Sequence, residues 1–486
     1  MSTKSISVAE LTPPCNYTGL IIWGGIAAAL AALFVVANWT LAVCAALIIV
    51  ALSAVENEPF LLSIIFLLPI GWFVKIDLPL GGKDARLDIA TAVHLLVVGG
   101  FFLRRIWRGR LSIRHLLEPR LTRASLVLLA AALASVVVGT GGITYGSLKA
   151  NVRLISYVAF YLFVLLWVNS RKRMRTVVIT LLASTILVGA YGIIQEIVGD
   201  YTSLWLYLNP PEDWFLPMEH RVPSFLNYSN TLAGYLNLML PFALACCILE
   251  KSGVVKKLGA WTLGLGILAL GFTQSRGGMV AFGCVLALAI LYFAKRWSHK
   301  VLLLFGLGLL GLGVSLLGNL LDPAHLSLNA NGGFDIATRL LLWATALKLF
   351  FSAPLFGAGY GNFVELYASY LPFSWIPPGI FGVHNTYLQF LAETGLIGFT
   401  AFFYLVFQSV RQGMRQLLRP ADTMDKILAF GVLGAILTIL IQGFVDFILS
   451  VSPAFGTLFW TMLALLVVSA RTAQPNARIG LTSATS

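Results

Sequence analysis

Apolar residues in this chain gather into long runs that polar segments separate. Fourteen runs lie at about 20–37, 39–55, 59–74, 88–103, 124–140, 154–170, 176–198, 230–249, 258–273, 277–294, 300–317, 384–408, 427–449 and 453–470. A helix needs roughly 20 apolar residues to cross a bilayer, so each run predicts a spanning helix, although several are short. The first two runs are joined so tightly that they could instead form a re-entrant pair or a bent hairpin.

Composition points to the same class of protein. Hydrophobic residues make up 58% of the 486 positions and charged residues only 11%, whereas soluble domains carry about 25% charged residues. This excludes a soluble enzyme, a disordered chain and a collagen-like chain. We therefore predict an all-α fold, a polytopic transmembrane helix bundle of about 12–14 spans. The five cysteines form neither a disulfide pattern nor a zinc motif.

The basic residues predict the orientation of this bundle. When the loops are assigned alternately to two sides, one side holds 24 of the 33 Lys and Arg residues with seven acids, and the rest of the chain is net negative. By the positive-inside rule, the basic side is cytoplasmic. We expect cytoplasmic termini at 1–19 and 471–486, bundle segments at 20–317 and 384–470, and no nucleic-acid partner. An uncleaved first span is favoured over a cleaved signal peptide.

Three segments on the predicted external side are too long or too polar to be simple connectors. They are 75–87, 199–229 and 318–383. Within the last, a large periplasmic loop, 335–352 has apolar residues at helical spacing and predicts an amphipathic helix that lies on the membrane face or caps a cavity. The glycine-rich stretch 353–363 lacks the βαβ context of a dinucleotide site, so we expect a tight turn there.

Ionisable residues near the membrane are costly and therefore mark candidate functional sites. Arg276 lies in TQSRGGMVAF, between two apolar runs. The ordinary interpretation is an arginine that reaches out to the lipid headgroups. Two following glycines at a helix start would instead let an anion approach backbone N–H groups, and arginine at a helix N-terminus is suited to phosphate. The other external candidates are Arg153, Glu196, His220, Arg221, Arg339, His384, Glu393 and Asp446.

Three of these have a functional and a structural interpretation. Arg221, before the run at 230–249, could pair with a loop carboxylate, and Asn230 and Thr231 are candidate caps for that helix. His384 opens HNTYLQFLAETGLIGF; it could bond to backbone or lipid, or a neutral imidazole there could take a proton from an attacking hydroxyl. For Glu393 we favour a helix-packing hydrogen bond.

Four segments together resemble the O-antigen ligase superfamily of bacterial polysaccharide membrane proteins. They are RVPSFLNYSNTLAGYLNLMLPFAL (221–244), TQSRGGMVAF (273–282), TRLLLWATALKLFFSAPLFGAGYGNF (338–363) and HNTYLQFLAETGLIGF (384–399). The ordered set is specific, although each piece alone is modest. A weaker likeness continues at 443–460. The first 200 residues match only in hydrophobic layout, and fourteen apolar runs exceed the twelve usual for the ligases.

The resemblance implies a metal-independent glycosyltransferase at the periplasmic face of the inner membrane, without a cofactor. It would transfer a glycan from undecaprenyl diphosphate to an acceptor hydroxyl on lipid A–core or on another glycan. By motif, Arg221 and Arg276 correspond to arginines that hold the diphosphate, and His384 to the proposed base. Arg339 corresponds to a loop arginine with a positioning role.

Several functions remain open at this stage. Within the superfamily, a ligase, a polymerase and a protein O-glycosylating transferase are candidates, and the short tail argues against the last. From other classes, a lipid-linked glycan transporter predicts deep charges and paired broken helices, and a scaffold needs none of Arg221, Arg276 and His384.

Overall fold

The computed structural model describes residues 39–69, 75–78, 85–202, 221–226, 228–296, 298, 300, 332–371, 382–419, 421–447 and 452–472, and the following account concerns these residues. Nine helices in them are long and apolar enough to cross a membrane. These are α6 (Arg120–Val138), α7 (Tyr145–Trp167), α8 (Arg171–Val198), α10 (Ser229–Leu249), α11 (Val254–Phe272), α12 (Arg276–Phe293), α16 (Thr386–Leu418), α17 (Thr423–Gln442) and α18 (Pro453–Thr472).

The remaining elements are shorter or less apolar. They are α2 (Trp39–Ala54), α3 (Glu58–Phe66), α4 (Ile89–Trp107), α5 (Ile113–Leu117), α14 (Gly332–Ser352), α15 (Phe363–Tyr370), and two antiparallel strands, β1 (Lys75–Leu78) and β2 (Ala85–Asp88). This hairpin lies almost entirely within 75–87, one of the three segments that the sequence marks as too long or too polar for a simple connector. The protein is thus a helical, multi-pass membrane protein with one small two-stranded ribbon in its described part.

The hydrophobic pattern predicted the helices well. Twelve of the fourteen runs form helices in the structure, whereas 20–37 and all but the first residue of 300–317 lie outside the described residues. Because the first run is not described, the tight pair expected from the first two runs stays a prediction. A sharp bend occurs one run later, where Ala45–Ala54 and Glu58–Phe66 meet at 118° and together could form one span. Asn57 caps the second of these helices by accepting a hydrogen bond from the backbone of Phe60.

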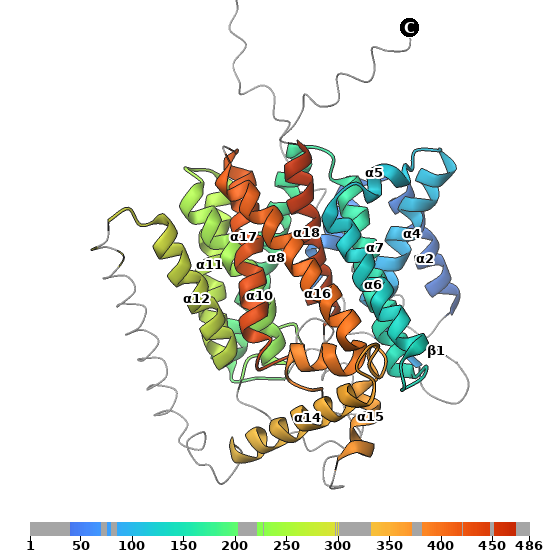
Figure 1. The fold of residues 1–486 in the computed structure, drawn as a ribbon. Coiled ribbons are helices and arrows are strands. Elements are labelled where there is room, and N and C mark those ends of the chain that lie inside the picture. The colour runs from blue at the N-terminus through green and yellow to red at the C-terminus, as the bar shows by residue number, and fades with distance from the viewer. Residues whose placement is uncertain are drawn as a thin grey trace, which may run out of the picture.

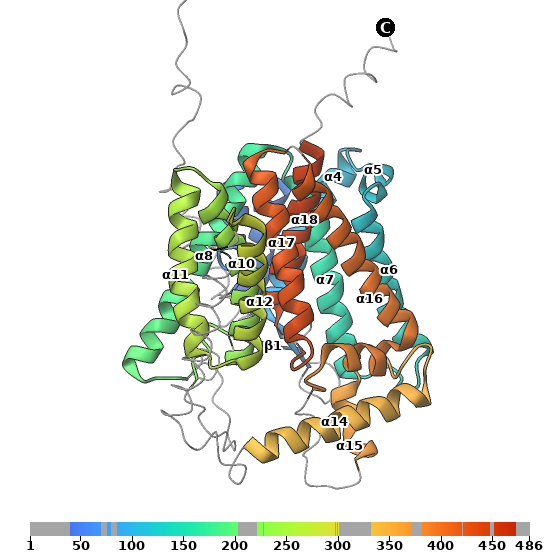
Figure 2. The same ribbon diagram turned by 60° about the vertical axis from the view of Figure 1, so that its left-hand side comes forward.

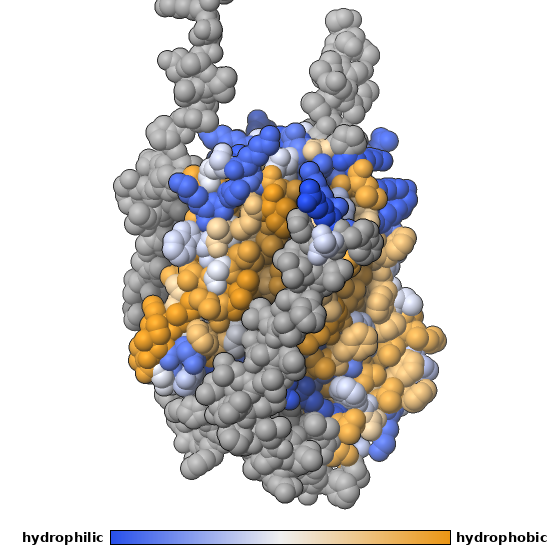
Figure 3. Space-filling view, turned by 90° about the vertical axis from the view of Figure 1, so that its left-hand side faces the viewer, coloured by the Kyte–Doolittle hydropathy of each residue, from blue (hydrophilic) through white to orange (hydrophobic). Residues whose placement is uncertain are grey.

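The helices form one bundle whose centre is occupied by α18 and α10 (Figures 1 and 2). Buried residues make up 94% of the membrane window of α18 and 78% of that of α10, against 28% for α12 at the edge. A helix with apolar residues on all sides fits the centre of such a bundle. On the face shown in Figure 3, apolar residues form a broad band and hydrophilic residues gather at the end where α18 stops.

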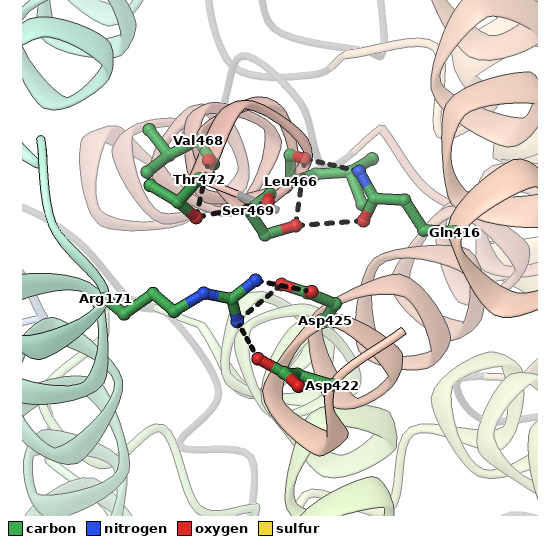
Figure 4. Close-up of polar contacts among 8 residues, drawn as sticks. All are labelled: Arg171, Gln416, Asp422, Asp425, Leu466, Val468, Ser469 and Thr472. Carbon is green, nitrogen blue, oxygen red and sulfur yellow. Dashed lines mark hydrogen bonds and ion pairs between the residues drawn. The ribbon is translucent and has the colours of Figure 1, made fainter. Parts of the chain in front are cut away.

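The two ends of the bundle differ. At the end where α18 stops, Arg171 of α8 contacts Asp422 at 2.7 Å and the buried Asp425 at 3.0 Å (Figure 4). Beside this pair, Gln416 of α16 and Ser469 of α18 are hydrogen bonded at 3.0 Å. We call this the paired end, because its helices are joined by opposite charges and complementary polar groups.

At the other end, which we call the loop end, α14 lies across the bundle (Figures 1 and 2). This helix confirms the amphipathic segment expected at 335–352. Its buried residues Leu342, Ala346 and Leu349 pack in one cluster with residues of α15 and of the start of α16. The helix therefore covers the end of the bundle.

A break in α16 anchors the chain that follows α14. Gly395 has φ +60° within the helix, and the segment after α14 enters the gap: Leu396 and Ile397 donate backbone hydrogen bonds to Pro354 and Leu355. A side chain at Gly395 would collide with the backbone of Leu355. The predicted tight turn of 353–363 is confirmed, and it docks into α16 rather than only connecting two helices.

Glu393 stabilises the same junction. Its buried carboxylate accepts hydrogen bonds from the backbone of Phe363 at 3.2 Å and from Gln389 Nε2 at 2.7 Å. This confirms the packing role favoured for Glu393 from the sequence.

Candidate functional site

The short turn that follows α17, residues 443–447, organises the loop end; we call it the α17 turn. It receives contacts from segments far apart in the sequence. Asn385 Nδ2 donates to the carbonyl oxygen of Phe444 at 3.1 Å, and the backbone of Thr386 donates to that of Gly443 at 2.8 Å. The start of α16 is thereby fixed against the end of α17.

His384 meets a carboxylate in this turn. Its Nδ1 lies 3.6 Å from Oδ1 of Asp446, and the two side chains are 33% and 15% exposed, so the pair is accessible from outside. The Asp446 carboxylate also accepts the backbone N–H of Phe447 at 2.8 Å, which fixes its orientation. A carboxylate at Nδ1 favours the tautomer that carries its proton there, which leaves Nε2 free to accept one.

The backbone of His384 is also unusual. It has φ +52°, a left-handed conformation that costs free energy for a residue with a side chain. Asn385 beside it caps α16 by accepting hydrogen bonds from Tyr387 and Leu388, both at 3.0 Å. The cap holds His384 outside the helix, with its ring toward Asp446.

Arg339 of α14 reaches the same turn. Its guanidinium donates to the carbonyl oxygen of Val445 at 3.1 Å. The helix that crosses the loop end is thus connected to the residue next to Asp446.

Arg276 is the first residue of α12, and Ser275 caps that helix by accepting from the backbone of Gly278 at 3.4 Å. The Arg276 side chain is exposed and has no hydrogen bond or ion pair with any described part of the chain. The expected helix start is confirmed.

The two glycines after Arg276 have a different role from the one expected. A Cβ at Gly277 would lie 2.5 Å from Val445 in the α17 turn, and one at Gly278 would lie 2.8 Å from Ala233 of α10. Close helix packing, rather than approach of a ligand, therefore requires glycine at both positions.

Arg221 lies at the turn between α11 and α12. Its Nε donates to the carbonyl oxygen of Thr273 at 2.9 Å, and its Nη2 donates to Asn230 Oδ1 at 2.7 Å. Asn230 therefore holds an arginine instead of capping α10, which has no side-chain cap; that expectation was wrong. Glu219 and Asp213, the loop carboxylates that could pair with Arg221, lie outside the described residues.

A buried amide network joins these parts. Asn237 of α10 donates to the carbonyl oxygen of Gly278 and to Gln442 Oε1, both at 3.0 Å. Gln442 Nε2 in turn donates to the carbonyl oxygen of Asn230 at 3.3 Å. The start of α12, the end of α17 and the residue that holds Arg221 are thus connected by hydrogen bonds.

The structure therefore brings four of the sequence candidates together around one turn. His384 and Arg339 contact the turn directly, Arg276 follows a helix start packed against it, and Arg221 is joined to it through Asn230 and Gln442. His220 lies outside the described residues. Among those described, no three His, Cys, Asp or Glu residues are grouped as metal ligands.

Sequence reasoning missed two contributors. Asp446 appeared only as one of several external ionisable residues, and its pairing with His384 spans 62 positions that no local pattern connects. Gln442 gave no signal, because a single amide at the end of an apolar run has no distinctive spacing.

A sequence model described as O-antigen ligase matches residues 261–403, from within α11 to within α16. This stretch includes Arg276, Arg339 and His384. The chain carries an O-antigen ligase family domain. Arg221 and Asp446 lie outside the matched range but contact or adjoin it in space. No curated protein matches the chain.

Family membership implies ligase or polymerase activity on lipid-linked glycans. The loop end offers the corresponding chemistry: a histidine beside a carboxylate, an exposed arginine at a helix start and a second arginine hydrogen bonded to Thr273 and Asn230.

Proposed function

We propose that this protein is an inner-membrane glycosyltransferase of the O-antigen ligase type, which transfers a glycan from undecaprenyl diphosphate to an acceptor hydroxyl on the periplasmic side. The observation that carries the proposal is the convergence of a His384–Asp446 pair and of Arg276 on the α17 turn. Acid–base and anion-binding groups thus share one accessible end of the bundle.

The distribution of charge supports this orientation. Arg104, Arg171, Lys256 and Arg415 all lie at the paired end, near helix termini, and the positive-inside rule makes that end cytoplasmic. The loop end then faces the periplasm. The segment 318–383 forms a periplasmic loop, and both termini are cytoplasmic.

The two arginines suit the leaving group. Departure of undecaprenyl diphosphate develops negative charge on the phosphate oxygens, and fixed cations stabilise such charge without reorganisation. Arg221 is oriented by hydrogen bonds to the carbonyl oxygen of Thr273 and to Asn230 Oδ1. The exposed Arg276 has no carboxylate partner within the described residues, so its charge is available to the donor.

His384 suits the acceptor. Its Nε2 takes the proton of the acceptor hydroxyl as the oxygen forms a bond to the anomeric carbon and the bond from that carbon to the phosphate oxygen breaks. Asp446 stabilises the resulting imidazolium. Attack opposite the leaving group inverts the anomeric configuration, and general-base assistance contributes about 10²–10⁴ in rate.

The reaction needs no external energy source, because the glycosyl–phosphate bond of the donor is already activated. We therefore expect no cofactor and no metal. EDTA should leave the transfer rate unchanged, and loss of activity that Mg²⁺ restores would contradict this part of the proposal.

The test is a transfer assay with the full-length protein in nanodiscs. The donor is undecaprenyl-diphosphate-linked glycan from the host strain, and wild type is compared with His384→Ala, with and without lipid A–core. A single transfer that requires lipid A–core indicates a ligase, and a ladder of repeats without it indicates a polymerase of the same superfamily.

The proposal predicts that His384→Ala remains folded and membrane-inserted but loses transfer by about 10²–10⁴. Unchanged transfer in this variant would exclude His384 as the base. Wild-type protein that binds the donor but forms no product would favour a transporter or scaffold.

A further inference from the structure

An open apolar groove runs along the membrane face of the bundle between α6 and α16. Its volume is about 520 Å³, and it is lined by Val127, Ala130, Ala131, Ala134, Ile397, Thr400, Ala401 and Tyr404. These two helices lie side by side in both ribbon views (Figures 1 and 2). Ala131 and Ala401 are buried beneath the groove, and Val127, Ala130, Ile397, Thr400 and Tyr404 are exposed along it.

The lining residues cover equal lengths of the two helices. On α6 they run from Val127 to Ala134 and on α16 from Ile397 to Tyr404, so the groove follows about two helical turns of each helix. At 1.5 Å per residue, this length is about 10 Å.

Along both helices, a cluster of arginines lies beyond the groove at the paired end. Seven residues beyond the groove on each helix are Arg120 and Arg411, and Arg415 lies one turn further on α16. Arg120 and Arg415 lie close enough to Arg411 to repel its charge. None of the three has an ion pair or hydrogen bond with any side chain or backbone group in the described residues.

The distance between the arginines and the groove matches the length of a lipid acyl chain. The arginines lie about 10 Å from the near end of the groove and about 20 Å from its far end, at 1.5 Å per residue. One leaflet contributes about 15 Å of hydrocarbon. An acyl chain whose headgroup sits at the arginines would therefore occupy the groove down to the middle of the membrane.

We propose that this groove and the arginines Arg120, Arg411 and Arg415 form a binding site for a diacyl phospholipid with an anionic headgroup. The phosphate and its net negative charge offset the repulsion within the arginine cluster, and one acyl chain fills the groove. The arginines of the site lie at the paired end, opposite to His384, and the proposal does not depend on the transfer reaction.

The experiment measures lipid retention by native mass spectrometry of the detergent-purified full-length protein, titrated with phosphatidylglycerol or phosphatidylcholine. Two variants test the two parts of the site: Arg411→Gln/Arg415→Gln removes charge, and Ala130→Phe fills the exposed rim of the groove. Lys251→Gln/Lys257→Gln is the matched control, because it removes two exposed charges at the same end, one in the α10–α11 connection and one in the first turn of α11. Melting temperature without added lipid verifies folding.

The proposal predicts preferential retention of phosphatidylglycerol by wild type and by the lysine control, and binding at least about tenfold weaker in the arginine variant. Ala130→Phe should weaken both lipids, because it blocks the chain rather than the headgroup. Equal losses in the arginine and lysine variants would overturn the proposal, as would unchanged binding in Ala130→Phe. Stronger retention of undecaprenyl phosphate than of phosphatidylglycerol would also overturn it, since the groove would then serve the carrier lipid.

Discussion

The two ends of α17 present arginine in opposite settings. At the paired end, Arg171 contacts the carboxylates of Asp422 and Asp425, so its charge is neutralised within the protein (Figure 4). At the loop end, Arg276 has no partner among the described residues, and Arg221 donates to neutral oxygens of Thr273 and Asn230.

This difference separates a structural from a functional role. An arginine paired with two acids joins helices and has little charge left for a ligand. An exposed arginine such as Arg276, which no carboxylate of the described residues contacts, keeps its charge at an accessible place, which is the arrangement that an anionic substrate requires. The same reasoning applies to Arg120, Arg411 and Arg415 at the paired end, which have no ion pair within the described residues.

Replacement of an arginine at the loop end should affect chemistry more than folding. Arg276→Gln is expected to lower the transfer rate by about 10²–10³, because a preorganised cation at the leaving group is lost. Arg276→Lys should restore little of it, since a point charge does not replace a bidentate fork. Transfer assays and melting temperatures in detergent measure both effects; wild-type rates in Arg276→Lys would indicate a cation that only contacts headgroups.

Loss of the orienting carboxylate should have a smaller effect. Asp446→Asn is expected to lower transfer by about 10–100-fold, because the imidazolium of His384 loses its stabilising charge while the base itself remains. The pH dependence of the rate should change as well, which a purely structural role of Asp446 would not cause. In the His384→Ala background, the same substitution should cost nothing further, and an additional loss there would contradict the pairing.

At the paired end, loss of an arginine should reduce stability rather than the transfer rate. Arg171→Gln leaves the buried Asp425 without its cation and should destabilise the protein by about 2 kcal/mol. Its transfer rate per folded molecule should be unchanged. A lowered melting temperature with a normal specific rate is the expected result, whereas a rate loss with normal stability would remove the distinction between the two ends.

Arg339 should contribute least. It contacts the α17 turn through one hydrogen bond to the carbonyl oxygen of Val445. Arg339→Met is expected to reduce transfer less than tenfold, mainly through the Michaelis constant of the donor or acceptor. Steady-state kinetics of the variant measure this, and a loss as large as that of Arg276→Gln would assign Arg339 a direct role on the substrate.

Much of this architecture could be read from the sequence. Runs of apolar residues determine membrane helices because the bilayer imposes their length, so twelve runs appear as helices. The amphipathic spacing of 335–352 predicted α14, and motif order predicted that Arg276, Arg339 and His384 would lie at one end.

Other features depend on contacts that no local pattern contains. The break of α16 at Gly395 interrupts a continuous apolar run, because the chain after α14 supplies the backbone partners. The glycines after Arg276 looked like room for a ligand, and their reason is packing against Val445 and Ala233. Asp446 could not be assigned to His384, since tertiary structure alone brings the two together.

The most direct test is to compare the donor affinity of variants that lack the loop-end arginines with that of a variant that lacks the paired-end Arg171. Undecaprenyl-diphosphate-linked glycan would be titrated into wild-type protein, Arg221→Gln/Arg276→Gln and Arg171→Gln, with binding measured by native mass spectrometry. Because each charge-assisted hydrogen bond contributes about 1.5–3 kcal/mol, the loop-end double variant should bind the donor about 100-fold more weakly or worse. Folded Arg171→Gln should bind as wild type does. Equal affinity of wild type and the loop-end double variant would contradict the claim that these two arginines hold the diphosphate.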